Sequence, residues 1–422
     1  MIATTQLFPG ITLRCYPDHR FKHGCLSVQL VRPMCREEAA LNALIPAVLL
    51  RGTQTCRDLR HITLRLDELY GASASALVRR VGDYQTTGLY CSFIEDKYAL
   101  PGDRVLEPMA EFLGELLFDP LLEAGGFSRE YVQSEKKNLI ATIESELNDK
   151  RAYAASRMIR TMCREDSFGI PRLGEKEQVE AINPIGAYSH YQKILQESPI
   201  ELFYVGSAQP ENVAALLKRI FGRIHRNPHS LAPQTPFHDA GNSGSITEQL
   251  DVAQGKLSMG FVTHITNRDP DYAAMQVLNT IFGAGMTSKL FMNIREKMSL
   301  CYSIGSGYYG AKGIMTVSAG IDCDKDAIVR EEILHQLAAC AAGQISQEEL
   351  TAAKEAIFSG LRAVHDSPGA IEGYYATMEL SGMNKDPQQY MQAVGAVTAE
   401  QVAAAAAKVT LHTCYFLKGV EA

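Results

Sequence analysis

Apolar residues recur along this chain with two different spacings. From Met109 to Leu117 and from Val329 to Leu337 they return every three or four residues, which is typical of helices that bury one side. The stretches 86–93, 257–263 and 314–319 are short, bounded by turn residues and interrupted by polar residues, which is typical of strands. Such strands beside long helices indicate an α+β fold, in which a mainly antiparallel sheet carries helices packed on one face.

The two halves of the chain repeat one pattern. A Ser-x-Glu triplet beginning at Ser128 is followed by Lys136, and a second triplet beginning at Ser346 is followed by Lys354 at the same spacing. Ser346 and Glu349 form a capping-box pattern at the start of a predicted helix. Each half then closes on an apolar run that predicts a strand, at 200–205 and at 414–417. We therefore predict two homologous α+β domains.

A change in composition divides the halves. Between Gly222 and Gly244 the chain is rich in Pro, Asn, Gly and Ser and has no apolar periodicity, as an interdomain linker does. The predicted boundaries are 1–222 for the first domain, 223–244 for the linker and 245–422 for the second domain.

Composition excludes several classes of function. The 422 residues are 46% hydrophobic and 21% charged, as in ordinary soluble proteins, and the net charge of −7 argues against nucleic-acid binding. We expect no signal peptide at the amino terminus and no membrane-spanning helix, because no apolar run approaches 18 residues. The ten scattered cysteines contain no Cys-x-x-Cys pair and are expected to be reduced. The predicted compartment is the cytoplasm.

Two segments resemble signatures of one enzyme family. Residues 43–53, Ala-Leu-Ile-Pro-Ala-Val-Leu-Leu-Arg-Gly-Thr, are similar to the zinc-helix segment of insulinase-like (M16) peptidases, where a His-x-x-Glu-His stretch runs into Lys/Arg-Gly-Thr. Residues 283–303, with Gly-Ala-Gly-Met-Thr-Ser-Lys-Leu-Phe, Arg-Glu-Lys and Leu-Cys-Tyr-Ser, are similar to the signature of that family's second domain. A weaker similarity runs from Ile182 to Gly206. Together these segments span most of the chain in the family's order.

The first segment lacks the residues that zinc chemistry requires. In an active M16 peptidase two histidines at i and i+4 bind Zn²⁺, and the glutamate beside them activates the metal-bound water. The matching positions here are Ala43, Ala47 and Pro46, and proline also disrupts a helix interior. The third zinc ligand of the family falls at or near Thr142, with Glu144 close by and interpreted as a surface carboxylate. The resemblance therefore implies a chain that binds no metal.

Two histidine pairs offer the i, i+4 spacing elsewhere. His225 and His229 lie in the predicted linker beside Pro228, and His19 and His23 lie in a predicted turn between strands. Neither segment favours the helix that would bring such a pair together, so we interpret both as exposed loop histidines.

The second signature keeps two residues with a role in the family. An Arg and a Tyr at the positions of Arg295 and Tyr302 hold the substrate and the oxyanion of the transition state in active members. A guanidinium and a phenol are strong hydrogen-bond donors where negative charge develops. The alternative is structural: a salt-bridged helix end at Arg295 and a core strand residue at Tyr302. In the family's pattern a Gly stands at Ser299 and an Ala at Cys301.

The resemblance implies one function and leaves alternatives open. Members of this family often work in pairs, one chain carrying the zinc and the other the Arg and Tyr donors. This chain resembles the second kind, a partner in peptide proteolysis whose zinc would lie in the partner subunit of a heterodimer. The alternatives are a non-catalytic scaffold or peptide-binding protein of the same fold and, ranked last, an independent peptidase with unconventional ligands.

Overall fold

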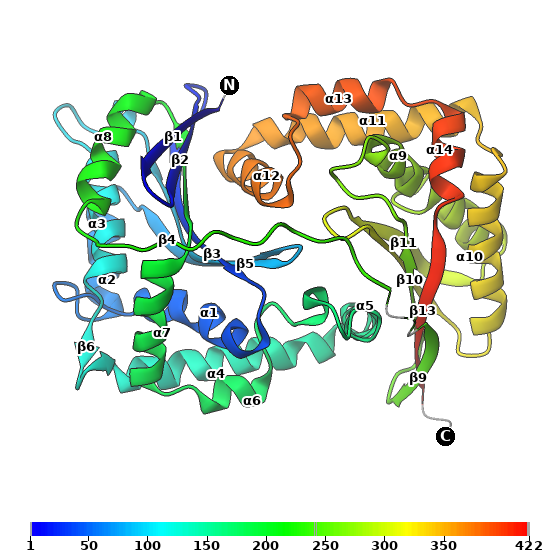
Figure 1. The fold of residues 1–422 in the computed structure, drawn as a ribbon, viewed down its shortest axis with the longest axis horizontal. Coiled ribbons are helices and arrows are strands. Elements are labelled where there is room, and N and C mark those ends of the chain that lie inside the picture. Colours follow the sequence, from blue (N-terminus) through cyan, green and yellow to red (C-terminus); the bar gives the residue numbers. More distant parts are fainter. Residues whose placement is uncertain (1, 240, 242, 420–422) are drawn as a thin grey trace. The chain divides into compact units, whose positions relative to one another are not determined.

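The computed structural model describes residues 2–239, 241 and 243–419, which form two compact units (Figure 1). Unit 1 comprises the residues up to Glu144 together with Ile170–Pro233 and His365–Thr377. Unit 2 comprises Ser145–Gly169, Gln234–Val364 and the residues from Met378 onward. Each unit therefore contains one segment from the opposite half of the chain.

Unit 1 is built on a six-stranded sheet with the order β1-β2-β8-β3-β5-β4. Its neighbours are antiparallel except β2 and β8, which run parallel. The strands are β1 (Ala3–Phe8), β2 (Ile11–Pro17), β3 (His23–Pro33), β4 (Ser73–Val81), β5 (Tyr84–Ile94) and β8 (Ile200–Gly206), and a separate two-stranded ribbon pairs β6 (Leu122–Glu123) with β7 (Gly126–Phe127).

The helices of unit 1 follow the amphipathic stretches of the sequence. They are α1 (Arg36–Leu49), α2 (Leu59–Glu68), α3 (Leu106–Phe118), α4 (Arg129–Ser145), α6 (Lys176–Ala181), α7 (Pro184–Glu197), α8 (Pro210–Phe221) and most of α12 (Pro368–Ser381).

Unit 2 is built on a five-stranded sheet with the order β11-β12-β10-β13-β9. Only β9 and β13 run parallel. The strands are β9 (Gly244–Leu250), β10 (Gly255–Val262), β11 (Cys301–Tyr309), β12 (Ile314–Ile321) and β13 (Thr410–Gly419), and the helices are α5 (Lys150–Met162), α9 (Tyr272–Phe282), a π-helix (Leu290–Lys297), α10 (Asp326–Ala341), α11 (Gln347–Ala363), α13 (Pro387–Gly395) and α14 (Ala399–Ala406).

The two sheets share one strand order. The strands β4-β5-β3-β8-β2 of unit 1 correspond in order to the strands β11-β12-β10-β13-β9 of unit 2. In each series the last two strands run parallel, and all other neighbouring strands run antiparallel. The sequence echo has a structural counterpart. The Nζ of Lys136 donates to the carbonyls of Glu180 and Ile182 at the end of α6, and the Nζ of Lys354 donates to the carbonyl of Gly395 at the end of α13. The predicted α+β class with two homologous parts is confirmed.

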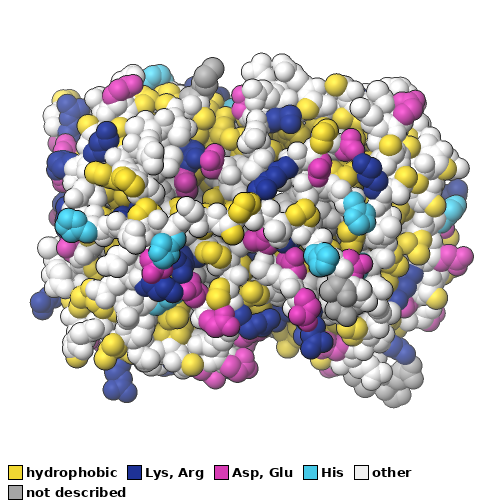
Figure 2. Space-filling model, in the orientation of Figure 1, with side chains coloured by type: hydrophobic (Ala, Val, Ile, Leu, Met, Phe, Trp, Pro, Cys, Tyr) yellow, Lys and Arg dark blue, Asp and Glu magenta, His cyan; other side chains and the backbone are white. Residues whose placement is uncertain are grey.

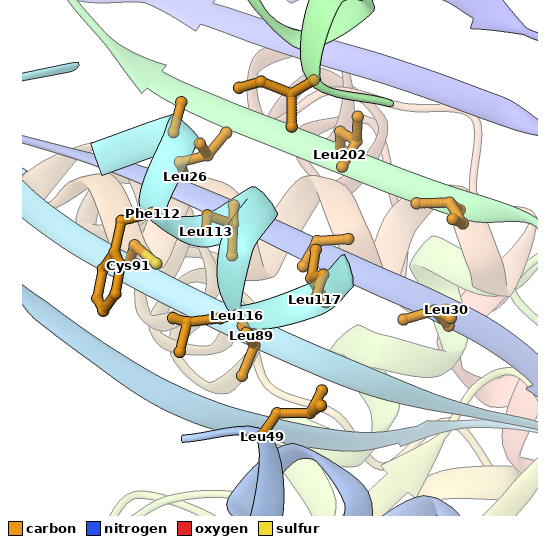
Figure 3. Packing of buried hydrophobic residues seen from close by; sticks show 14 of the residues in the cluster. Leu26, Leu30, Leu49, Leu89, Cys91, Phe112, Leu113, Leu116, Leu117 and Leu202 are labelled. Atoms are coloured by element: carbon orange, nitrogen blue, oxygen red, sulfur yellow. The ribbon is translucent and has the colours of Figure 1, made fainter. Parts of the chain in front are cut away.

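The main core of unit 1 lies between its sheet and helices α1, α3 and α7. Alternate residues of the central strands, such as Leu26 of β3, Leu89 of β5 and Leu202 of β8, point to one face. Figure 3 shows the side chains of Phe112, Leu113, Leu116 and Leu117 of α3 packed against them. All of these side chains are buried, so this layer positions the helices that carry the candidate site.

One helix covers the opposite face of each sheet. In unit 1, Glu372 of α12 contacts Ser27 and Gln29 of β3, which alternate with the core residues Leu26 and Val28. In unit 2, Met158 and Met162 of α5 lie over Gly260 of β10. The structure thus adds to the predicted helical layer a helix on the second face, and that helix comes from the other half of the chain.

The segment 225–239 contains no helix or strand. It is nevertheless held by hydrogen bonds at several points: the amide of Asn227 donates to the carbonyl of Gln196, the amide of His229 to that of Glu197, and Tyr84 Oη to that of Ala232. The domain boundaries 1–222, 223–244 and 245–422 are inferred from the duplication in the sequence, and they stay a prediction.

Acidic and basic side chains are interspersed on the face of the molecule drawn in Figure 2. Within the described ranges no helix has the length and apolar character needed to cross a membrane.

Candidate functional site

Helix α1 carries Ala43, Pro46 and Ala47, the positions that the sequence resemblance matches to the zinc-binding motif. The helix buries most of its apolar residues against the unit 1 sheet. Ala43 and Pro46 are buried in this layer and Ala47 is half-buried. A methyl group and a pyrrolidine ring offer no lone pair to a metal, so these side chains do not fit a zinc ion.

Pro46 does not interrupt α1, which continues to Leu49. A proline at this position has no N–H for the carbonyl of Asn42, four residues earlier. The hydroxyl of Thr87 on β5 donates to that carbonyl instead, at 2.5 Å. A buried side chain from the sheet therefore replaces the missing helical hydrogen bond, and the expected disruption of the helix is absent for that reason.

The Asn42 side chain belongs to a buried polar cluster. Its Nδ2 donates to Gln85 Oε1 at 2.9 Å, and its Oδ1 lies 2.8 Å from His190 Nε2 on α7. Burial lowers the pKa of His190, and the nearby Glu38 opposes that shift. The interior beside α1 thus contains amide and imidazole groups that are hydrogen-bonded to one another. The only sign of this cluster in the sequence is a single Asn within an apolar helix.

Helix α4 carries Thr142, at or near which the sequence resemblance puts the third ligand. Thr142 is exposed, and its hydroxyl donates to the Asn138 carbonyl at 2.9 Å. Glu135, one buried carboxylate of this helix, is engaged by Arg51 and by Asn138 Nδ2. Glu144 is 53% exposed and pairs with Lys176, as expected for a surface carboxylate.

Neither histidine pair lies within one helix or within a group of metal-binding side chains among the described residues. His19 precedes β3, which begins at His23, and His225 and His229 lie in the segment without helix. Across the described residues no group of three His, Cys, Asp or Glu side chains is placed to hold a metal ion. The absence of bound zinc stays a prediction about the purified protein.

Arg295 lies on the π-helix of unit 2. The N–H of Met298 donates to the carbonyl of Asn293, five residues earlier, which is the spacing of such a helix. The guanidinium of Arg295 stacks on the Phe291 ring at 4.6 Å and lies 3.8 Å from Glu296 Oε1. Its side chain is 41% exposed, so the guanidinium keeps free donor directions.

Tyr302 is the second residue of the edge strand β11 and is 64% exposed. Its hydroxyl donates to Asp322 Oδ1 at 3.3 Å, a long contact. A hydrogen bond from Lys325 lowers the pKa of Asp322, so this carboxylate also has a cationic partner. Tyr302 is therefore not the core strand residue that the structural alternative required.

The turn between the two residues explains one position of the motif. Ser299 has a φ of 51°, in the left-handed region that glycine adopts without cost. A glycine at this place, as in the family's pattern, would relieve that strain. Burial raises the pKa of Cys301 to about 11, and the positive charge of Arg295 opposes that shift.

Comparison with known proteins shows which proteins this chain resembles. Residues 187–357 match the family model described as "Peptidase M16 inactive domain". The "Probable inactive metalloprotease YmfF" of Bacillus subtilis (strain 168) is 29% identical over 412 residues, which cover 98% of this chain and 96% of that protein. The chain is similar to the M16 peptidase family. It lacks the His-x-x-Glu-His motif and is a metalloprotease-like protein of the inactive type.

Solved structures agree with the fold of this chain. A conserved protein from Enterococcus faecalis V583 superposes with a TM-score of 0.91 at 27% identity and covers 99% of both chains. A "peptidase M16 inactive domain" from Pseudomonas fluorescens gives a TM-score of 0.81 at 17% identity, with 100% of this chain and 99% of that chain covered, and supports the fold alone.

Proposed function

We propose that this chain is the zinc-free subunit of an M16 pair, in which a zinc-bearing homologue holds the metal and this chain contributes Arg295 and Tyr302 to peptide hydrolysis. The observation that carries the proposal is the contrast between two motifs. The zinc-helix positions hold Ala43, Pro46 and Ala47, whereas two donor residues of the second signature are present and exposed.

The chemistry assigned to the two donors follows from their groups. Hydrolysis of a peptide bond places negative charge on the carbonyl oxygen in the transition state, and a positioned donor to that oxygen lowers the barrier. Arg295 is always protonated and Tyr302 carries a phenolic hydrogen, so both can donate at neutral pH. The zinc, the attacking water and the general base would all belong to the partner.

The contacts that hold the two donors at rest are weak. A long hydrogen bond to Asp322 and a stacking contact with Phe291 are each exchangeable for a contact with substrate at small cost. All ten cysteines are free thiols, which supports work in a reducing compartment such as the cytoplasm.

The experiment combines this chain with the zinc-bearing homologue that co-purifies with it. Peptidase activity of the mixture should exceed that of either protein alone, and metal analysis should find zinc only in the partner. Arg295→Ala and Tyr302→Phe should each lower kcat by about 10- to 1,000-fold, the range for losing one donor.

Two matched variants control for nonspecific effects. Lys297→Ala removes a neighbouring cation of the π-helix, and Tyr98→Phe removes an exposed phenol in unit 1; both should leave kcat unchanged. Full activity of the Arg295 and Tyr302 variants would instead favour the scaffold or peptide-binding alternative. Loss of co-elution would make the two residues interface residues, and one zinc bound tightly by this chain would contradict the proposal.

A further inference from the structure

On the α5-facing side of the unit 2 sheet, three successive rows across three adjacent strands are almost free of large side chains, whereas the next row, Val262–Ile314–Tyr309, packs against the α5 segment. The register of β10, β12 and β11 aligns three rows across the sheet. The rows are Lys256–Gly320–Ser303, Ser258–Ser318–Gly305 and Gly260–Thr316–Gly307. A sheet face that packs against a helix normally carries apolar side chains, but this patch carries glycines and hydroxyls beside one lysine.

Helix α5 closes only part of this patch. Met158 and Met162 rest on Gly260, where an added Cβ would lie 2.5 and 2.7 Å from their sulfur atoms. Nearer the start of α5 a groove of about 330 Å³ stays open between the helix and strands β11 and β12. This volume lies at the lower end of the range for ligand pockets, about 300–1,000 Å³.

The fold does not require glycine at the floor of the groove. Gly305 and Gly307 both lack a positive φ. A Cβ on Gly305 would meet nothing closer than the Gly283 carbonyl oxygen at 3.5 Å, and one on Gly307 would lie 3.4 Å from Thr316 Oγ1. Glycine weakens a strand interior and often marks a place where a ligand or another backbone approaches closely. These two glycines keep open a channel of main-chain width.

The hydroxyl groups along the channel have few hydrogen-bond partners among the described residues. Thr316 lines the groove and Ser303 lies in the adjacent row, and neither hydroxyl makes a hydrogen bond with any residue that the structure describes. Ser318 has only a 3.3 Å contact with Ser258. Hydroxyl groups on adjacent strands can bond to the peptide groups of an extended chain, because such a chain presents donors and acceptors alternately.

One end of the groove is cationic. Arg151 lines it, is exposed and forms no ion pair with any described residue. Lys256 lies in the sheet row next to the groove floor and bonds only to the Gln254 amide oxygen among the described residues. Burial lowers its pKa, Asp149 opposes that shift and Arg151 adds to it. Asp149 also lines the groove. Its carboxylate caps α5 by accepting from the amides of Arg151 and Ala152, and its negative charge offsets part of the positive charge of Arg151 and Lys256, so this end of the groove carries two cations and one anion.

We propose that this groove binds the C-terminal segment of a short extended peptide, with the terminal carboxylate held by Arg151 and Lys256. The floor offers no side-chain pockets, so recognition depends on the peptide main chain and its terminal charge rather than on an acidic side chain. The proposal rests on the proposed function for the class of ligand, a peptide, and adds the group by which unit 2 holds it.

The test measures binding by this chain alone, without a partner or proteolysis. Five-residue peptides of Ala, Gly and Ser, labelled with fluorescein at the amino end, are titrated by fluorescence anisotropy in three forms: free carboxylate, C-terminal amide, and amide with an internal Asp. The free-carboxylate peptide should bind at least ten-fold more tightly than both amides, and the difference should shrink in high salt.

The variants separate the charge from the channel. Arg151→Gln and Lys256→Gln should each weaken binding of the free-carboxylate peptide about ten-fold and leave the amide unaffected. Gly305→Val should abolish binding, because its side chain fills the channel. Lys150→Gln, the adjacent cation of α5 that does not line the groove, is the matched control and should bind normally.

The overturning results are equally defined. Equal affinity for the carboxylate and amide forms, or unchanged binding by Arg151→Gln, would overturn the proposal without depending on whether Gly305→Val folds. If the Asp-containing amide binds as tightly as the free-carboxylate peptide, the two cations recognise acidic side chains. That result would overturn the proposal that they hold the terminal carboxylate. Inactivity of the mixed subunits, by contrast, would count against the proposed function and leave these affinities unchanged.

Discussion

The continuity of helix α1 depends on a single hydrogen bond from outside the helix. Pro46 deprives the Asn42 carbonyl of its helical donor, and Thr87 supplies a hydroxyl in its place. The sequence predicts the loss of the metal ligands, because the identities of residues 43, 46 and 47 are sufficient for that conclusion. It does not predict the compensation, because Thr87 is 41 residues away from Pro46 and only the sheet brings them together.

Thr87→Val should therefore destabilise unit 1 by about 1–3 kcal/mol, the cost of a buried carbonyl left without a donor. In a Pro46→Ala background the cost should be smaller, because the amide of residue 46 can bond the Asn42 carbonyl. Urea unfolding of the four proteins in a double-mutant cycle measures the coupling.

The adjacent Thr86 is a matched control for that cycle. Its hydroxyl is buried and has no hydrogen-bond partner among the described residues. Thr86→Val should be neutral or stabilising. Equal costs of Thr87→Val with and without Pro46 would show that the hydroxyl does not replace the helical bond.

At the scale of elements, α5 and α12 are the part of the fold that sequence reasoning missed. Amphipathic patterns predict a helix and its buried side but do not name the sheet that covers that side. A buried ion pair fastens each of the two helices. Glu372 of α12 binds Arg79 of β4 at 2.7 Å, and Asp166, just beyond α5, binds Lys312 of the β11–β12 turn at 3.0 Å. In both units the anion comes from the helical segment, and the cation comes from a strand of the sheet in unit 1 and from a turn between two strands in unit 2.

Glu372 is fully buried and also accepts from Ser27 and Gln29, so its loss should release α12. Glu372→Ala should cost about 3 kcal/mol, the lower end for breaking a buried pair because Arg79 is 31% exposed. Hydrogen exchange should then accelerate about 100-fold in residues 368–377, with smaller changes in the rest of unit 1.

Glu355→Ala on α11 is the control for that measurement, since Glu355 and its partner Arg362 are both more than 60% exposed. An exposed pair of this kind contributes about 0–1 kcal/mol. Unchanged exchange in α12 of the Glu372 variant would mean that apolar packing alone holds the helix.

The whole molecule is organised by this exchange of helices. The sequence echo predicts two similar halves, and the matching strand orders and the paired Lys136 and Lys354 contacts agree with it. A linear reading of the chain assigns 145–169 to the first half and 365–377 to the second, whereas the compact units include them the other way round. No local pattern contains that information, because it depends on contacts between residues more than a hundred positions apart.

A break in the linker should consequently leave the protein in one piece. A protease recognition sequence inserted after Ser230, which is exposed, allows complete cleavage of the folded chain. The amino-terminal fragment then carries α5, whose Met158 and Met162 lie in the apolar core of unit 2, and the carboxy-terminal fragment carries α12, whose Glu372 is buried in unit 1. Separation would expose both docking faces, at about 25 cal/mol per Å² of apolar surface, so the fragments should co-elute from a sizing column as one species.

Urea should separate the two fragments at a lower concentration than it unfolds the uncut chain, because the covalent link no longer limits their dissociation. Cleaved protein carrying Glu372→Ala should separate at a lower urea concentration still. Two fragments that elute apart without denaturant would show that the exchanged helices do not hold the halves together.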